Sequence, residues 1–394
     1  MSESNGSGAD WRRLGASIYL PTAVSFIGFG AIVPLVPLTA RALGASVAEA
    51  ALVVALMGIG GLIGALPAGV IAHRFGEKKS LVGALLVDVA CLVVCAYAPN
   101  EWVLAGAVFV TGLSGAMLSL ARQSYLTVAV AIEYRARALS TLGGVFRIGS
   151  LLGPLMGAAV VSLWGLPAAY LVAACTSMLA AVITLALPDL ASPELEVDEP
   201  VRLLRVLRDH SRTYATVGVG ASALMLVRAS RDALLPLWCD QIGLDAVTTS
   251  LIFALSSAID TMLFYLGGSV MDRFGRRAVS VPSMVIMGTS FALLPLAQST
   301  SGVALVAALL GLGNGISAGV VMTIGSDASP AIGRPQFLAG WRLTTGIGQA
   351  AGPLLITGIA AFAPLALAAF SIGAVGLGGA AWLWRWLPVK ALSN

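Results

Sequence analysis

Three aspartates inside long apolar segments are the residues most able to do chemistry in this sequence. Asp88, Asp232 and Asp260 each sit among mostly apolar neighbours. Charge within hydrocarbon is costly, so ionisable residues there usually belong to ion pairs, proton carriers or ligand contacts. Burial makes a carboxylate hold a proton more tightly, and a neighbouring arginine makes it hold the proton less tightly. We therefore predict that these three aspartates carry protons.

Arg228 is the predicted partner of Asp260. The two segments that carry these residues are expected to form an antiparallel helical hairpin that turns near Leu244. Arg228 precedes Leu244 by 16 residues and Asp260 follows it by 16, so their side chains should lie at similar depth. We predict an Arg228–Asp260 ion pair, which Asp232 can share from one helical turn away. Such a pair either couples proton binding to helix movement or is a static link within the hairpin.

The remaining residues of the apolar segments suggest the kind of solute. If the helix that carries Arg228 and Arg231 lines a cavity, these two arginines suit an anionic or zwitterionic compound, and the aromatic residues suit an amphiphile. The other predicted cavity residues are Phe26, Phe29, Met225, Trp238, Phe253 and Trp341. Arg147 and Arg342 lie several residues in from the predicted cytoplasmic helix ends, and their long side chains can reach that interface instead.

Signatures of an enzyme are missing from the sequence. It has no metal-ligand cluster, no nucleotide-binding loop and no nucleophile with a neighbouring base. We therefore expect a protein that is not an enzyme and that has no cofactor and no metal site.

The composition indicates the elements that position these residues. Mean hydropathy is +0.92 and 11% of the residues are charged, values outside the range of soluble domains. Continuous apolar runs of this length cross a bilayer as helices, because a helix satisfies its own backbone. The chain is predicted to be an all-α membrane protein with twelve spans. They are 15–40, 47–72, 80–98, 102–125, 138–162, 167–187, 213–239, 247–271, 279–298, 301–326, 336–361 and 364–386.

A polar stretch divides the chain into two halves. The predicted domains are an N-terminal six-helix bundle (1–187), a cytoplasmic linker (188–212) and a C-terminal six-helix bundle (213–394). The basic half of the linker has helical spacing. Among the Lys and Arg outside the predicted spans, all but Arg41 fall on one side of the predicted membrane, which places both termini in the cytoplasm and leaves Arg41 in an outer loop. The net charge of +4 then reflects orientation and contact with membrane lipids, and it does not indicate nucleic-acid binding.

The second half repeats the first at an offset of 199 residues. The loop "GVIAHRFGEK" at 69–78 has its copy in "GSVMDRFGRR" at 268–277. The same offset relates Gly149, Gly153 and Pro154 to Gly348, Gly352 and Pro353. A constant offset over separate regions indicates an internal duplication. In transporters with such parallel repeats the binding site lies near the midplane, between the halves.

These motifs resemble those of the major facilitator superfamily, of the twelve-helix drug:proton antiporter type. The loop "GVIAHRFGEKKSL" resembles the superfamily's signature loop, although His73 replaces its usual aspartate. "IGFGAIVPLVP" and "GSLLGPLMGA" resemble helices 1 and 5 of the antiporters. In helix 4, Val108 occupies the position of the usual arginine. The resemblance implies two pseudo-symmetric bundles and an exporter driven by protons through alternating access, in the cytoplasmic membrane and as a monomer.

Two further groups of residues follow from these motifs. The predicted conformational latch at the cytoplasmic surface consists of Gly69, His73, Arg74, Gly76, Asp272, Arg273, Gly275 and Asp327. Within it, Asp327 is the expected partner of Arg273, and Glu133 that of Arg74. The alternative is that these arginines only orient the chain in the membrane. The predicted antiporter motif consists of Gly149, Gly153, Pro154, Gly157, Gly352 and Pro353, which either pack a helix closely or seal the contact between the moving halves.

Other functions remain open from the sequence. An uptake symporter, a facilitator or a lipid flippase of the same fold has the same helices and duplication. A membrane receptor or scaffold that binds without transporting is the alternative of another class.

Overall fold

The computed structural model describes residues 15–130, 132–186, 203–330 and 332–388. Throughout these residues the regular structure is helical, as predicted. The predicted linker 188–212 lies partly outside them, because its description begins at residue 203.

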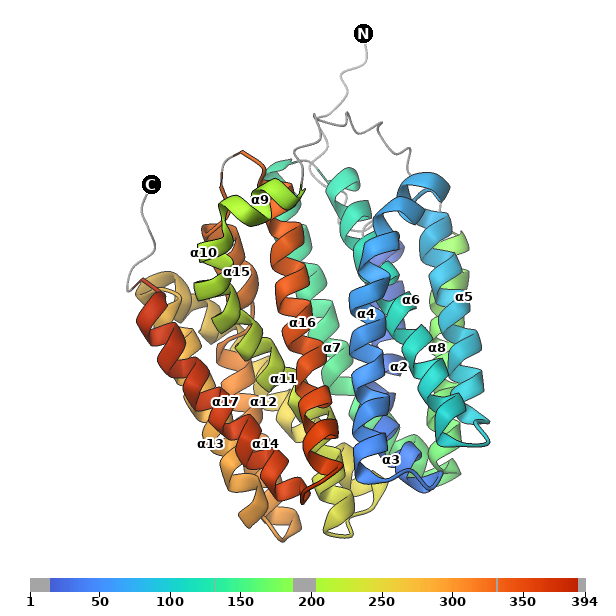
Figure 1. The fold of residues 1–394 in the computed structure, drawn as a ribbon. Helices are drawn as coiled ribbons and strands as arrows, with labels where there is room; N and C mark the ends of the chain where they lie inside the picture. The colour runs from blue at the N-terminus through green and yellow to red at the C-terminus, as the bar shows by residue number, and fades with distance from the viewer. Residues whose placement is uncertain (1–14, 131, 187–202, 331, 389–394) are drawn as a thin grey trace.

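The first half forms one bundle of helices (Figure 1). Its elements are η1 (Gly15–Tyr19), α2 (Leu20–Ile32), α3 (Leu35–Ala42), α4 (Val47–Phe75), α5 (Glu77–Ala96), α6 (Glu101–Ala129), α7 (Ile132–Trp164) and α8 (Leu166–Ala186). Within the bundle α2 packs on α7 and α8, α4 packs on α6, and α5 packs on α6 and α8.

The second half forms a similar bundle. It begins with α9 (Leu203–Asp209), α10 (Ser211–Thr213) and η2 (Tyr214–Gly218). The membrane helices that follow are α11 (Val219–Gln241), α12 (Ala246–Phe274), α13 (Arg277–Leu293) with η3 (Leu294–Leu296), α14 (Thr300–Ile316), α15 (Val320–Asp327), α16 (Arg334–Ala360) and α17 (Leu365–Trp386). Here α11 packs on α16, α12 on α14 and α13 on α17.

These helices make twelve spans in two bundles of six. Within the described residues nine helices are long and apolar enough to cross a membrane, and the pair α2 and α3, bent by 43°, makes a tenth. The other two are α11 and α16, which have spanning length. α11 carries Arg228, Arg231, Asp232 and Asp240, whereas α16 carries only Arg334 and Arg342, which are both exposed.

Two predicted spans contain breaks. The span 15–40 bends between α2 and α3, where Pro34 lacks the backbone N–H that would continue the helix. The span 301–326 divides into α14 and α15 at Gly319, whose φ of 78° lies in the left-handed region.

The backbone confirms the internal duplication. Gly44 and Gly243 both have positive φ, 98° and 77°, and so do Gly76 and Gly275, 81° and 86°. Each pair is separated by the repeat offset and lies where the chain turns between helices. The copies therefore share their connections as well as their helices.

The two bundles meet mainly along two helix pairs, α4 with α16 and α7 with α12, with smaller contacts of α3 and α4 with α11. In the first contact, a Cβ on Gly346 would lie 2.9 Å from Leu62, so α16 and α4 approach closely. The predicted helical structure of the linker's basic half is confirmed in its described part, where α9 lies across the end of the second bundle (Figure 1). That end is called the α9 end below, and the opposite end, where α3 lies, the α3 end (Figure 1).

Candidate functional site

A buried ion pair connects the two bundles at mid-helix. Arg147 lies near the middle of α7, and Asp260 is the middle residue of α12. Arg147 Nη1 donates to Asp260 Oδ1 over 2.6 Å, and the two side chains are 18% and 12% exposed. The Arg147 guanidinium also lies 4.2 Å from the centroid of the Phe264 ring. Asp260 therefore links the first bundle to the second.

The predicted direct pair between Arg228 and Asp260 is wrong. Arg228 donates to the side-chain and backbone oxygens of Asn314, and Asn314 Nδ2 donates to Asp260 Oδ2 over 2.7 Å. The predicted similar depth of the two residues is consistent with this bridge. Asn314 lies between them because α14 approaches α12 very closely: a Cβ on Gly315 would lie 2.7 Å from the carbonyl oxygen of Asp260.

Sequence reasoning missed both residues that contact the Asp260 carboxylate. Asn314 stands in the apolar run "GLGNGI", where a polar side chain flanked by glycines is a usable signal. The alternative that Arg147 reaches the cytoplasmic interface is wrong, because the residue sits halfway along a helix of 33 residues and its side chain contacts Asp260. Together, Arg147, Asp260, Asn314 and Arg228 form what we call the Asp260 cluster.

Asp232 has a different neighbour from the one expected. Its carboxylate lies 3.5 Å from Arg231 Nε, not beside Arg228. Neither of these two atoms has a hydrogen-bond partner among the described residues. The guanidinium of Arg231 lies 4.7 Å from the ring centroid of Phe253. Asp232, Arg231 and Phe253 thus form a second charged group in the C-terminal bundle.

Asp88 lies within the N-terminal bundle. It is 8% exposed and accepts a hydrogen bond of 2.8 Å from Ser177 on α8. Arg122 on α6 interacts with it electrostatically and donates to Ser25 on α2 over 2.7 Å. The helices around Asp88 are α2, α5, α6 and α8, so this carboxylate is separate from the contact between α7 and α12.

The predicted cavity residues fall into two groups. Trp238 and Trp341 are core residues, 2% and 3% exposed, and their indole N–H groups donate to the carbonyls of Ala297 and Val321. The remaining members are partly buried except Phe253, which is 4% exposed; they are Phe26, Phe29, Met225, Arg228 and Arg231. Phe26 stacks in a tilted arrangement with Phe146 of α7, with ring centroids 4.4 Å apart.

The glycines of the antiporter motif pack within each bundle, so of the two alternatives close helix packing is confirmed and a contact between the halves is wrong. Cβ atoms on Gly153 and Gly157 would lie 2.6 and 2.7 Å from the backbone of α2. Gly348 and Gly352 of α16 meet the backbone of α11 in the same way. Because glycine has no side chain, α2 packs directly on α7. The other face of α7 contacts α12.

One member of the predicted latch has another partner than expected. Asp327 accepts hydrogen bonds of 2.6 and 3.3 Å from Arg276, not from Arg273. Arg273 is exposed, and its guanidinium lies over the neighbouring Phe274 ring. Arg276 immediately precedes α13, which places it nearer the end of α15. The side chains of His73 and of Glu133, the expected partner of Arg74, lie outside the described residues.

A second ion pair joins the bundles at the α3 end. Arg41 Nε lies 2.9 Å from Asp240 Oδ2, and the side chains of both residues are 34% exposed. Arg41 and Asp240 are separated by 199 residues, the repeat offset, so they occupy equivalent positions in the two halves. Equivalent positions can meet only near the pseudo-twofold axis. The offset was therefore a signal for this contact that sequence reasoning did not use.

Comparison with known proteins connects this architecture to a family. A sequence model described as Major Facilitator Superfamily matches residues 18–268 and 217–394. The chain is 30% identical over 167 residues to the multidrug resistance protein MdtG of Escherichia fergusonii, which covers 41% of this chain and 41% of that relative. For MdtG of Enterobacter lignolyticus the identity is 29% over 176 residues, covering 44% of this chain and 42% of the relative. The matches thus span about two fifths of the relatives' length.

Solved structures share the fold over nearly the whole chain. The nucleoside transporter NupG superposes with a TM-score of 0.75 at 15% identity, covering 95% of this chain and 99% of NupG. A D-xylose-proton symporter gives a TM-score of 0.72 at 13% identity, covering 94% and 97%. At such identities the likeness establishes the fold alone. With the duplication, the twelve spans and the family match, this chain is a multi-pass membrane transporter that belongs to the Major Facilitator Superfamily.

Proposed function

We propose that this transporter is a proton-coupled exporter of small amphiphilic or anionic compounds that works by alternating access. In this proposal it lies in the cytoplasmic membrane with both termini in the cytoplasm, and it moves its substrate without chemical change. The observation that carries the proposal is the Arg147–Asp260 ion pair, which joins the two bundles at mid-helix.

The environment of Asp260 suits a group that binds protons in only one conformation. Each carboxylate oxygen accepts a hydrogen bond, one from Arg147 and one from Asn314. A proton on Asp260 would remove the charge that Arg147 faces and would leave that arginine unpaired, which is strongly destabilising in a buried site. Proton binding and the contact between α7 and α12 therefore oppose each other.

Alternating access requires that the two ends of the molecule open in turn. In this structure the Arg41–Asp240 pair holds the bundles together at the α3 end. We assign this end to the outside of the cell. Movement of α7 away from α12 on protonation of Asp260 would then change which of the two ends is open.

The substrate class rests on the charged and aromatic side chains of the C-terminal bundle. Arg228 and Arg231 are cations, and Arg231 lies against Phe253, so an anionic group and an apolar ring could both be accommodated. The relatives named multidrug resistance protein support the export of drug-like compounds. Asp232, beside Arg231, and Asp88, beside Ser177, are further candidates for proton binding.

Flux measurements in vesicles test the proposal. The purified full chain is reconstituted, and the movement of dansylglycine, an anionic amphiphile, and of rhodamine 123, a cationic one, is followed with and without an imposed pH gradient. We expect accumulation against the dye gradient only when the proton gradient is present, with dansylglycine preferred. Transport that ignores the pH gradient identifies a facilitator and contradicts the proposal, and binding without flux identifies a receptor.

The Asp260→Asn variant tests, in the same assay, whether Asp260 couples transport to the proton gradient. The substitution keeps the shape of the side chain but cannot cycle between charged and neutral forms. We expect downhill exchange of dye to continue and its dependence on the pH gradient to disappear. Full retention of gradient-driven accumulation would exclude Asp260 as the coupling residue. Asp232→Asn and Asp88→Asn, measured in the same way, then identify the residue that replaces it.

A further inference from the structure

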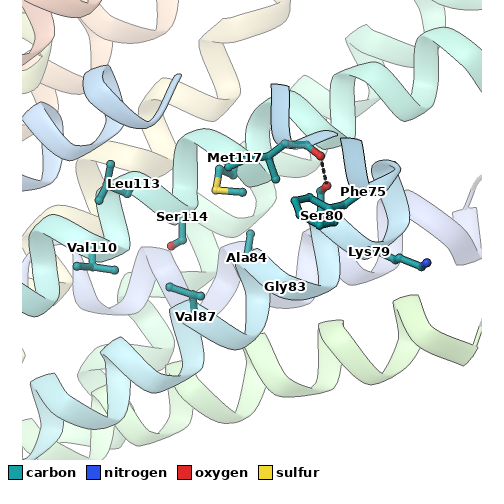
Figure 2. A pocket seen from close by; sticks show the side chains of 11 residues that line it. Phe75, Lys79, Ser80, Gly83, Ala84, Val87, Val110, Leu113, Ser114 and Met117 are labelled. Carbon is teal, nitrogen blue, oxygen red and sulfur yellow. Dashed lines mark hydrogen bonds between the residues drawn. The ribbon is translucent and has the colours of Figure 1, made fainter. Parts of the chain in front are cut away.

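A cavity of 410 Å³ lies between α4, α5 and α6, on helices that contribute nothing to the Asp260 cluster. Figure 2 shows Lys79 at one end of this cavity and Val87 and Val110 towards the other. The proposed transport function makes no use of it, and the predicted latch and antiporter residues are not among its lining.

The lining is mostly apolar. Of the described residues that line the cavity, Lys79, Ser80 and Ser114 carry polar side-chain groups, and only Lys79 is charged. Ser80 donates to the carbonyls of Ile71 and Gly76 (Figure 2 shows the first), and Ser114 donates to the carbonyl of Thr111. The two hydroxyl protons are thus already used. A complementary occupant has an apolar body and one anionic end that reaches the Lys79 ammonium.

The cavity is oriented as a membrane lipid is. Lys79 lies in the first turn of α5, next to the connection at Gly76, and Val87 lies two turns further along the helix. Eight residues of helix span about 12 Å. The cationic end is therefore at the end of the membrane helices, and the apolar end extends towards the middle of the span.

The cavity opens to the outside of the bundle. Phe75 is 54% exposed and Val87 is 45% exposed, and Lys79 and Gly83 are also exposed. A Cβ placed on Gly83 would have no atom within 4 Å. Because α5 lies at the edge of the first bundle (Figure 1), this opening faces the acyl chains of the surrounding membrane.

The duplicated half does not reproduce these features. At the repeat offset, Ala278 stands in place of Lys79 and Pro282 in place of Gly83. The side chain of Met287 lies against Gly313, the counterpart of Ser114. The cavity and its cation are therefore properties of the first half and do not follow from the duplicated fold itself.

We propose that this cavity binds an anionic phospholipid of the surrounding leaflet, with an acyl chain along α5 and the phosphate at Lys79. Because the cavity opens towards the surrounding lipid, its occupant comes from the membrane. The single ammonium at the membrane-surface end selects an anionic headgroup, and the apolar lining accepts the chain.

Photo-crosslinking tests the proposal on the full chain. The protein is reconstituted in phosphatidylcholine vesicles that contain a small fraction of phosphatidylglycerol with a diazirine in its acyl chain, and labelled peptides are identified by mass spectrometry. We expect labelling of the α5 and α6 segments that line the cavity. Gly83→Leu should reduce this labelling several-fold, because the leucine fills the open space. Gly106→Leu is the matched control, since Gly106 is also helical, exposed and without atoms within 4 Å of a Cβ.

Substitutions of Lys79 test recognition of the lipid headgroup independently of the cavity's shape. Lys79→Ala should lower labelling by phosphatidylglycerol about fivefold, the factor expected for one lysine near an anionic membrane surface. Lys79→Arg should retain labelling, and unchanged gel filtration of each variant shows that it is folded. Equal labelling of wild type and Gly83→Leu would overturn the proposal. So would equal labelling by a phosphatidylcholine probe, or displacement of the lipid by rhodamine 123, which would make the cavity an entry site for substrate.

Discussion

At the scale of single residues, the Asp260 cluster joins a carboxylate of the second bundle to an arginine of the first. Arg147 supplies the opposite charge from the first bundle, and Asn314 supplies the second hydrogen bond from α14. Arg228 is kept one residue away, where it binds both oxygens of Asn314. Three charged side chains therefore share one network, and loss of any member changes the environment of the others.

A double-mutant cycle should detect the coupling between Arg147 and Asp260. Arg147→Gln and Asp260→Asn each leave one buried charge without its partner, which is expected to cost about 3 kcal/mol or more in the free energy of unfolding. The double variant removes both charges and should cost clearly less than the sum of the two. Thermal unfolding of the four proteins in the same detergent measures this. Additive losses of stability would show that the two residues do not interact in solution.

At the scale of helices, glycines allow close backbone contact and so determine which helix faces pack against each other. The α7 glycines bring α2 within backbone contact, and this leaves the Arg147 face for α12. A larger side chain at the contact has nowhere to go, because the neighbouring atoms belong to the backbone.

Gly153→Leu should therefore destabilise the first bundle. The added Cβ would lie 2.6 Å from the backbone of Gly30, so the helices must separate, and overpacking of this kind costs about 1–3 kcal/mol. Gly143→Leu in the same helix is the control, since a Cβ there has no atom within 4 Å. We expect a lower unfolding temperature for Gly153→Leu alone. Equal unfolding temperatures would contradict the contact between α2 and α7.

The start of α12 provides a pH-dependent test. Asp245 precedes the helix and accepts a hydrogen bond of 2.7 Å from the backbone N–H of Thr248. Hydrogen bonding at Thr248 lowers the pKa of Asp245 below its ordinary value. Since the folded state has the lower pKa, this stabilisation is present above about pH 4 and is lost as the pH falls through the lowered pKa.

Asp245→Ala should lower stability by about 1 kcal/mol at neutral pH and by less in strong acid. Asp245→Asn keeps a capping oxygen that does not titrate, so it should retain most of the stability and reduce the loss in acid. Unfolding temperatures of the three proteins across the acid range measure both effects. An alanine variant that matches wild type at neutral pH would show that the cap does not stabilise α12.

At the scale of the whole molecule, the fold could be predicted from the sequence more fully than the site. Apolar length and the repeated loops were sufficient for the helices, the two bundles and the positions of Gly76 and Gly275, because these depend on local composition and spacing. The partner of Asp260 was not predictable in this way. Sequence spacing gives the depth of a residue in a span, but which neighbour faces it depends on helix rotation and on close approaches such as that at Gly315. The prediction that Arg273 binds Asp327 is wrong for the same reason, since the arginine that faces Asp327 is Arg276.

The pseudo-twofold axis passes close to Arg41 and Asp240, which makes charge reversal informative. Arg41→Asp or Asp240→Arg places like charges together and should favour opening of the α3 end, with a several-fold change in dye flux. The double reversal restores opposite charges across the axis and should recover most of the wild-type rate. Both side chains are partly exposed, so the effect should weaken at high salt. Failure of the double reversal to recover any flux would argue against this ion pair as a gate.

The most direct test of the central claim is a distance measurement between the halves as the pH changes. Ala42 and Gln241 are exposed, flank the Arg41–Asp240 pair and are related by the repeat offset. Spin labels on cysteines at these two positions, after replacement of the four native cysteines, report the separation of the bundles at the α3 end. On acidification we expect the wild-type distance distribution to shift, and we expect Asp260→Asn to show the acidic distribution at every pH. An unchanged pH-dependent shift in Asp260→Asn would contradict the claim that protonation of Asp260 drives the movement of the two bundles.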